Sequence, residues 1–104
     1  MSGAANRLRG EATLELAGRK LLLRPTFAAL VQAEEELGPL FALVERAGAG
    51  QLRIAEIAAL FWHCLAEREG ASRDEVGEAV VAMGLARCAA PLRALLGEIL
   101  RGGT

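Results

Sequence analysis

The run Ile54-Ala-Glu-Ile-Ala-Ala-Leu-Phe-Trp-His-Cys-Leu65 is the most apolar stretch of the sequence, and it holds the only tryptophan and the only histidine. At about 100° per residue of an α-helix, Ile57 and Phe61 fall within one arc, and neighbouring apolar residues widen it to about half of the cylinder. A helix that lies on a surface has a narrower apolar stripe. We therefore predict a central helix over Arg53–Glu69 that is packed on at least two sides.

The composition of the 104 residues favours one helical domain and excludes several function classes. Hydrophobic residues make up 53%, and many are Ala and Leu, which favour helices. The net charge of −1 argues against general nucleic-acid binding. The central run is too short to cross a membrane. The N-terminus has no apolar signal region and there are only two cysteines, so we expect a cytoplasmic protein with free thiols.

The residues ahead of the central run have the pattern of a β-hairpin. Residues 11–16 alternate between polar and apolar side chains, as in a half-buried strand, and residues 19–24 supply the returning strand. Gly18 can adopt the positive φ of a tight turn between them. A lone hairpin is marginally stable in water. We therefore expect it to pack on the helices, or to pair its edge with a second copy in a homo-oligomer.

Helix start and stop signals divide the rest of the chain. Thr26 is a good N-cap and Gly38 a good terminator, so they bound a helix whose predicted apolar stripe is Phe27, Leu30, Val31 and Leu37. Further helices are predicted over residues 39–47, over residues 73–83 after the capping box that begins at Ser72, and over residues 86–100. Pro91 indicates either a later start of the last helix, near residues 88–90, or a kink.

These patterns predict an α+β fold: an N-terminal β-hairpin followed by a compact bundle of about five α-helices. Residues 1–10 are predicted to be a flexible arm, and residues 11–101 a single domain. Within that domain the hairpin takes residues 11–24 and the helical body residues 26–101.

The reactive side chains form no catalytic or metal-binding pattern. His63 and Cys64 are adjacent on the predicted helix and point about 100° apart, which is a poor geometry for a nucleophile and its base. A zinc site with Cys88 lacks a fourth ligand and standard spacing. We therefore predict no enzyme activity, no cofactor and no metal. His63 is expected to be an exposed helix residue near Glu67, four positions later.

Three consecutive carboxylates, Glu34, Glu35 and Glu36, close the helix that follows Thr26. The macrodipole disfavours negative charge at this end. The run fits two interpretations: pairing with basic groups on a partner, or a solvated face that pairs with nearby arginines. Phe61 and Trp62 are likewise open to two interpretations, core residues or a partner patch, and their place in the central run favours the core.

Several short motifs, taken in order, resemble those of a known family. They are Asn6-Arg7-x-Arg9-Gly10-Glu11, Leu14-x-Leu16-x-Gly18, Leu23-Arg24-Pro25-Thr26-Phe27-x-Ala29-Leu30, Glu34-x-x-x-Gly38, Phe61-Trp62 and the closing helix Leu92–Leu100. Together they resemble the small tail proteins of gene transfer agents and related prophages, in the phage tail assembly chaperone group.

The resemblance implies a chaperone that binds the tape measure protein and recruits tail tube protein during tail assembly. The alternative is a small structural subunit of the tail or neck. A tube subunit needs a large sheet for its ring, and one hairpin does not supply it, so we favour the chaperone. A DNA-binding regulator is disfavoured, because the last helix offers only three arginines. The predicted partner contacts are Arg24, Phe27, Leu30, Glu34, Glu35, Glu36, Leu40, Phe41, Leu92 and Leu96.

Overall fold

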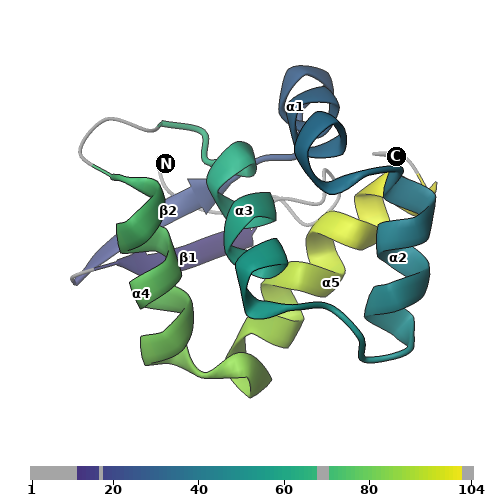
Figure 1. Ribbon diagram of the computed structural model, residues 1–104. Coiled ribbons are helices and arrows are strands. Elements are labelled where there is room, and N and C mark those ends of the chain that lie inside the picture. Colours follow the sequence, from purple (N-terminus) through teal and green to yellow (C-terminus); the bar gives the residue numbers. More distant parts are fainter. Residues whose placement is uncertain (1–11, 17, 68–70, 102–104) are drawn as a thin grey trace.

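The computed structural model describes residues 12–16, 18–67 and 71–101, and these residues form two strands and five helices (Figure 1). In chain order the elements are β1 (Ala12–Leu16), β2 (Arg19–Leu23), α1 (Phe27–Leu37), α2 (Leu40–Gly48), α3 (Ile54–Cys64), α4 (Arg73–Met83) and α5 (Leu85–Arg101). The predicted hairpin followed by helices is confirmed. The prediction of a flexible arm concerns residues 1–10, which lie outside the described part of the chain.

Helix α3 lies between its neighbours and supplies the centre of the hydrophobic core (Figure 1). It contacts α1 and α4, so the predicted packing on at least two sides is confirmed. Leu60 and Phe61 are almost completely buried, at 1% and 0% exposed. Trp62, in contrast, is only partly buried and packs against the edge of this core. The core also includes residues from both strands and from every other described helix.

Helix α3 ends at Cys64, earlier than the predicted Glu69, so the prediction is wrong at this end. Leu65 leaves the helix with an extended backbone and forms a β-bridge to Leu23. Two backbone hydrogen bonds flank the bridge: the amide of Arg24 donates to the carbonyl of Cys64 over 2.6 Å, and the amide of Ala66 donates to that of Leu22 over 2.9 Å. These contacts fix the end of α3 against the outer edge of β2.

The hairpin packs one apolar face against the helices. Its strands are antiparallel, with Leu14 opposite Leu21 and Ala12 opposite Leu23. Leu14 and Leu23 are fully buried, and β1 contacts α4 and α5. Leu65 and Ala66 already pair with the outer edge of β2. A second copy that paired with the hairpin would therefore have to use the edge of β1. That pairing stays a prediction.

Local capping groups explain where α1 and α4 begin and end. The Thr26 hydroxyl accepts a hydrogen bond from the Ala29 amide over 3.1 Å, and Gly38 ends α1 with a φ of 91°. Ser72 and Glu75 exchange reciprocal side chain to backbone bonds at the start of α4. The predicted capping box and the bounds of both helices are confirmed. Each cap stabilises its helix by about 1 kcal/mol.

Helix α5 begins at Leu85 and continues through Pro91, so the predicted helix over residues 86–100 is confirmed. Of the two alternatives for Pro91, the later start near residues 88–90 is wrong. The amides of Arg87 and Cys88 both donate to the carbonyl of Gly84, which closes the first turn before the proline is reached. Pro91 removes only one backbone donor from a helix that is already formed. Tertiary packing also holds α5, because Cys88 and Leu95 are buried.

The close crossing of α3 and α4 gives a stability prediction. A Cβ atom at Gly77 would lie 4.0 Å from the Cβ of Ala58, which is an ordinary contact distance. Alanine is favoured over glycine in a helix interior by about 1 kcal/mol. We therefore expect Gly77→Ala to raise the free energy of unfolding by about 0.5–1 kcal/mol in urea titrations. Gly84→Ala is the control: Gly84 has a φ of 83°, so this substitution should lower stability. Destabilisation by Gly77→Ala would contradict the described packing.

Candidate interaction surface

Helix α1 packs on α3 through small side chains, and this places its large apolar residues outside. Ala29 and Ala33 are buried at 7% and 0% exposed, with Leu30 and Leu37 partly buried beside them. Phe27 is 84% exposed. The predicted stripe is therefore wrong for Phe27 and also for Val31, which is exposed. The prediction assumed that the large side chains face the core, whereas α1 approaches α3 through its alanines.

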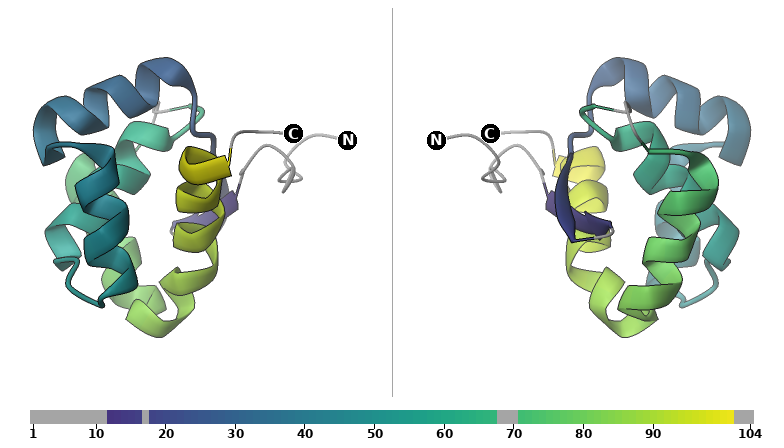
Figure 2. Two further views of the ribbon diagram at one scale, coloured as in Figure 1. Left: turned by 90° about the vertical axis from the view of Figure 1, so that its right-hand side faces the viewer. Right: turned by 90° about the vertical axis from the view of Figure 1, so that its left-hand side faces the viewer.

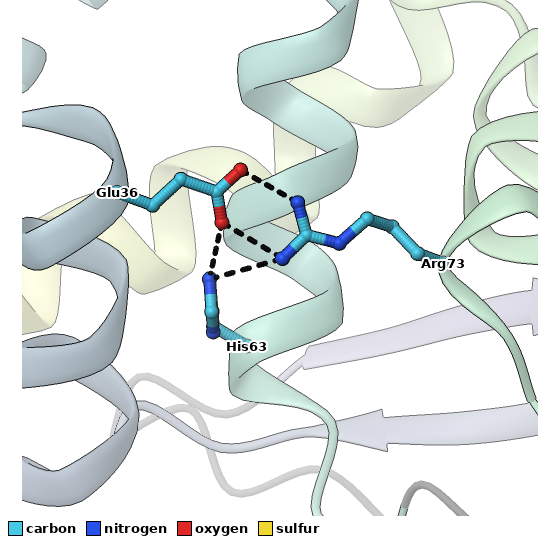
Figure 3. Close-up of polar contacts among 3 residues, drawn as sticks. All are labelled: Glu36, His63 and Arg73. Carbon is cyan, nitrogen blue, oxygen red and sulfur yellow. Dashed lines mark hydrogen bonds and ion pairs between the residues drawn. The ribbon is translucent and has the colours of Figure 1, made fainter.

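A polar cluster of Glu36, His63 and Arg73 joins α1, α3 and α4 (Figure 3). Arg73 donates two hydrogen bonds to the carboxylate of Glu36, from Nη1 to Oε2 over 2.6 Å and from Nη2 to Oε1 over 2.7 Å. His63 Nε2 lies 2.8 Å from Glu36 Oε1. A bidentate pair of this kind fixes the relative position of both side chains. The cluster therefore holds three helices together at one point.

The prediction that His63 is exposed near Glu67 is wrong. His63 is 7% exposed, and its ring packs edge to face with Trp62 at 5.2 Å between centroids. Arg73 covers the Trp62 ring, with its guanidinium carbon 4.7 Å from the ring centroid. Sequence reasoning missed this arrangement because Glu36 and Arg73 are far apart in sequence. Arg73 directly follows the cap residue Ser72, so the sequence motif at this point predicted the start of α4 and not the contact with Glu36.

The cluster stabilises the ionised form of Glu36. The hydrogen bonds from Arg73 have the largest effect, followed by the hydrogen bond with His63, and together they lower the pKa of Glu36 from 4.5 to about 2. A group whose pKa is lowered by folding adds stability above its unfolded pKa. That contribution is therefore complete above about pH 4.5 and is lost as the pH falls towards 2.

The acid dependence of stability tests the cluster. We expect Glu36→Gln to lower the free energy of unfolding at pH 7 by about 1 kcal/mol, a value reduced for solvent screening because the side chain is 37% exposed. The difference from wild type should shrink as the pH falls from 4.5 towards 2. Urea titrations at several pH values measure it. The matched control is Glu35→Gln on the exposed side of α1, which should cause no such loss; equal losses from both variants would contradict the role of Glu36.

The outward side of α1 carries an apolar and acidic surface, which we call the α1 face: Phe27, Val31, Glu34 and Glu35. These residues fall within an arc of about 100° on the helix. All four are exposed. The Glu34 carboxylate also accepts a hydrogen bond from the Leu40 amide over 3.1 Å, which links α1 to the start of α2. The face therefore combines an aromatic side chain with negative charge at the C-terminus of α1, where the last turn has no basic residue.

The other predicted contact residues are spread over the molecule. Phe41 is 78% exposed on α2, whereas Leu96 is buried at 8% exposed and belongs to the core. Leu40 and Leu92 are partly buried against that core. Arg24 lies at an open pocket that is also lined by Thr26, Gln32 and His63. The structure does not gather these residues into one surface, and their role in partner binding stays a prediction.

A second exposed apolar site, which the sequence prediction missed, lies where α4 meets α5. Val81 is 62% exposed and Leu85 is 57% exposed, and Gly84 makes the turn between them. Val81 points about 100° away from the buried Val80 on α4, so its side chain turns away from the core.

A comparison with known protein families identifies the chain. The family model described as phage tail tube protein, GTA-gp10, matches residues 9–102. The match spans both strands and all five helices of the described fold. The chain belongs to this family. The resemblance to tail proteins of gene transfer agents and phages is therefore confirmed, whereas membership of the tail assembly chaperone group does not follow from a match to a tail tube family.

No curated protein and no solved structure matches the chain. In the described part of the chain, no helix alone is long and apolar enough to cross a membrane, although α4 and α5 together reach that length and composition across a bend of 118°. No three potential metal ligands group together among the described residues.

Proposed function

We propose that the chain is a non-enzymatic structural subunit of a phage-like tail of the gene transfer agent kind. The observation that carries this proposal is the match to the GTA-gp10 tail tube family over residues 9–102. On this proposal the partners are other tail proteins, with the tail tube protein and the tape measure protein as the nearest candidates. This departs from the chaperone hypothesis favoured by the sequence motifs, because the family match fits the structural alternative better.

The surface of the molecule supports a role in assembly. Phe27 and Phe41 expose most of their side chains, and exposed aromatic residues are enriched at protein–protein contacts. The near-neutral net charge of −1 favours protein partners over nucleic acid. The polar cluster of Glu36, His63 and Arg73 rests on contacts between helices, and we assign it to stability and not to chemistry.

A tail assembly chaperone is the second candidate, and one structural observation favours it. The sheet of the described residues has two strands, and Leu65 and Ala66 pair with the outer edge of β2. A subunit that forms a tube ring through its own strands needs a larger sheet with open edges. A chaperone would instead bind the tape measure protein in the cytoplasm, deliver it to tail tube protein and leave before the particle is complete.

The composition of the particle distinguishes the two candidates. Purified particles should contain this chain at many copies per tail, measured by quantitative mass spectrometry against the tape measure protein in the same sample. We expect this multiple-copy result for a structural subunit. Absence from particles, together with tape measure protein that stays soluble only when the chain is co-expressed, would contradict the structural proposal and support the chaperone.

A further inference from the structure

Helix α2 forms the outer layer on one side of the molecule. It lies on the right in Figure 1 and faces the viewer in the left view of Figure 2. It packs most closely on α1, which precedes it in the chain. Leu43 is its one fully buried side chain, with Leu40, Val44 and Ala47 partly buried, whereas most of α3 is buried; both helices lie wholly within the described residues. Helix α2 is therefore attached to the core by a small apolar contact.

The sequence of α2 gives this helix little stability of its own. It has nine residues, and isolated helices shorter than about 12 residues are marginal in water. Pro39, at the N-cap, has no side-chain oxygen to accept a hydrogen bond from the first turn, and that turn holds no acidic residue to complement the macrodipole. The helix therefore depends on its contacts with the rest of the chain.

Among the described residues, side-chain hydrogen bonds join α2 to the other helices near each of its ends. The Leu40 amide donates to Glu34 Oε2 of α1 over 3.1 Å, and this bond is exposed to solvent. Arg46 Nη1 lies 2.9 Å from Oε1 and 2.8 Å from Oε2 of Glu56, in the first turn of α3. The Arg46 side chain is 34% exposed, so water screens this ion pair and weakens it. Both contacts are therefore of a kind that opens readily.

The chain on both sides of α2 can act as a hinge. Gly38 has a φ of 91° directly after α1, and Gly50 has a φ of 71° in the connection to α3. Glycine tolerates a wide range of backbone angles, and small loop residues often absorb the rotation in hinge motions. The Glu56 carboxylate also accepts a hydrogen bond from the Arg53 amide over 2.8 Å. The start of α3 therefore keeps its cap when α2 moves away.

We propose that α2 opens as a unit about Gly38 and Gly50 while the rest of the fold stays closed, and that this opening uncovers the apolar site beneath Leu43. Opening breaks the contacts of α2 but leaves the polar cluster that joins α1, α3 and α4 intact. Local openings of this kind occur at free energies below that of global unfolding. The open form presents apolar surface that the closed form hides, so α2 works as a hinged lid on one side of the core.

Native-state hydrogen exchange distinguishes local opening of α2 from global unfolding. After correction for intrinsic rates, we expect the α2 amides to exchange faster than the α3 amides by about tenfold or more. Low concentrations of urea should change α2 exchange little, because a local opening exposes little surface, whereas α3 exchange should accelerate. Mass spectrometry of peptic peptides that separate the two helices measures both rates.

Variants inside and outside α2 sharpen the test. Arg46→Met removes the ion pair with Glu56 and should raise α2 exchange by about threefold. The matched control Arg87→Met removes an exposed arginine of α5 and should leave α2 exchange unchanged. Glu36→Gln weakens the polar cluster, which α2 does not join, so it should raise α3 exchange and leave α2 exchange as in wild type.

Three results would each overturn the proposal: equal exchange of α2 and α3 with the same urea dependence, no faster exchange of α2 in Arg46→Met, or an equal rise of both helices in Glu36→Gln. These measurements use the isolated chain. They therefore test the hinged lid independently of whether the chain is a structural subunit of the particle.

Discussion

Helix α3 packs closely against small side chains of its neighbours, and the arrangement of the other helices follows from this contact. Ala33 of α1 and Gly77 of α4 let neighbouring helices approach it, while Phe61 fills the centre. Alanines and a limited set of large apolar residues therefore fill the core. Several other large apolar side chains are left over, and the helices place them on the surface at α1, at α2 and at the turn between α4 and α5.

The carboxylates at the end of α1 have two different roles: Glu36 stabilises the fold, and Glu35 contributes surface charge. Glu36 faces inward, where Arg73 and His63 hold it ionised with a pKa of about 2. Glu35 faces solvent one position earlier, because successive residues on a helix point about 100° apart. Pairing with a nearby arginine thus applies to Glu36, while pairing of Glu34 and Glu35 with basic groups on a partner stays a prediction. The macrodipole cost of the exposed carboxylates remains, and a basic contact would offset it.

Local signals made most of the fold predictable, and non-local contacts account for what was missed. Thr26, Ser72 and Gly38 act within one turn of their own position, so they gave helix ends that the structure confirms. The end of α3 depends instead on pairing between Leu65 and Leu23, which are distant in sequence.

The candidate surface was predictable only in part, for the same reason. The sequence shows a surplus of apolar residues that includes Phe27 and Phe41, and it shows the run of carboxylates in α1. It does not show that Val81 and Leu85 are exposed, because their exposure depends on how α4 and α5 dock. The burial of His63 likewise needs Glu36 and Arg73, which arrive from two other helices.

We propose that this member of the GTA-gp10 family is a structural subunit of a phage-like tail. Cryo-electron microscopy of intact particles tests it most directly, at a resolution that places the helices of each subunit. A structural subunit should appear as copies of the five-helix body repeated around or along the tail axis. A complete tail reconstruction whose density is fully assigned to other proteins would contradict it.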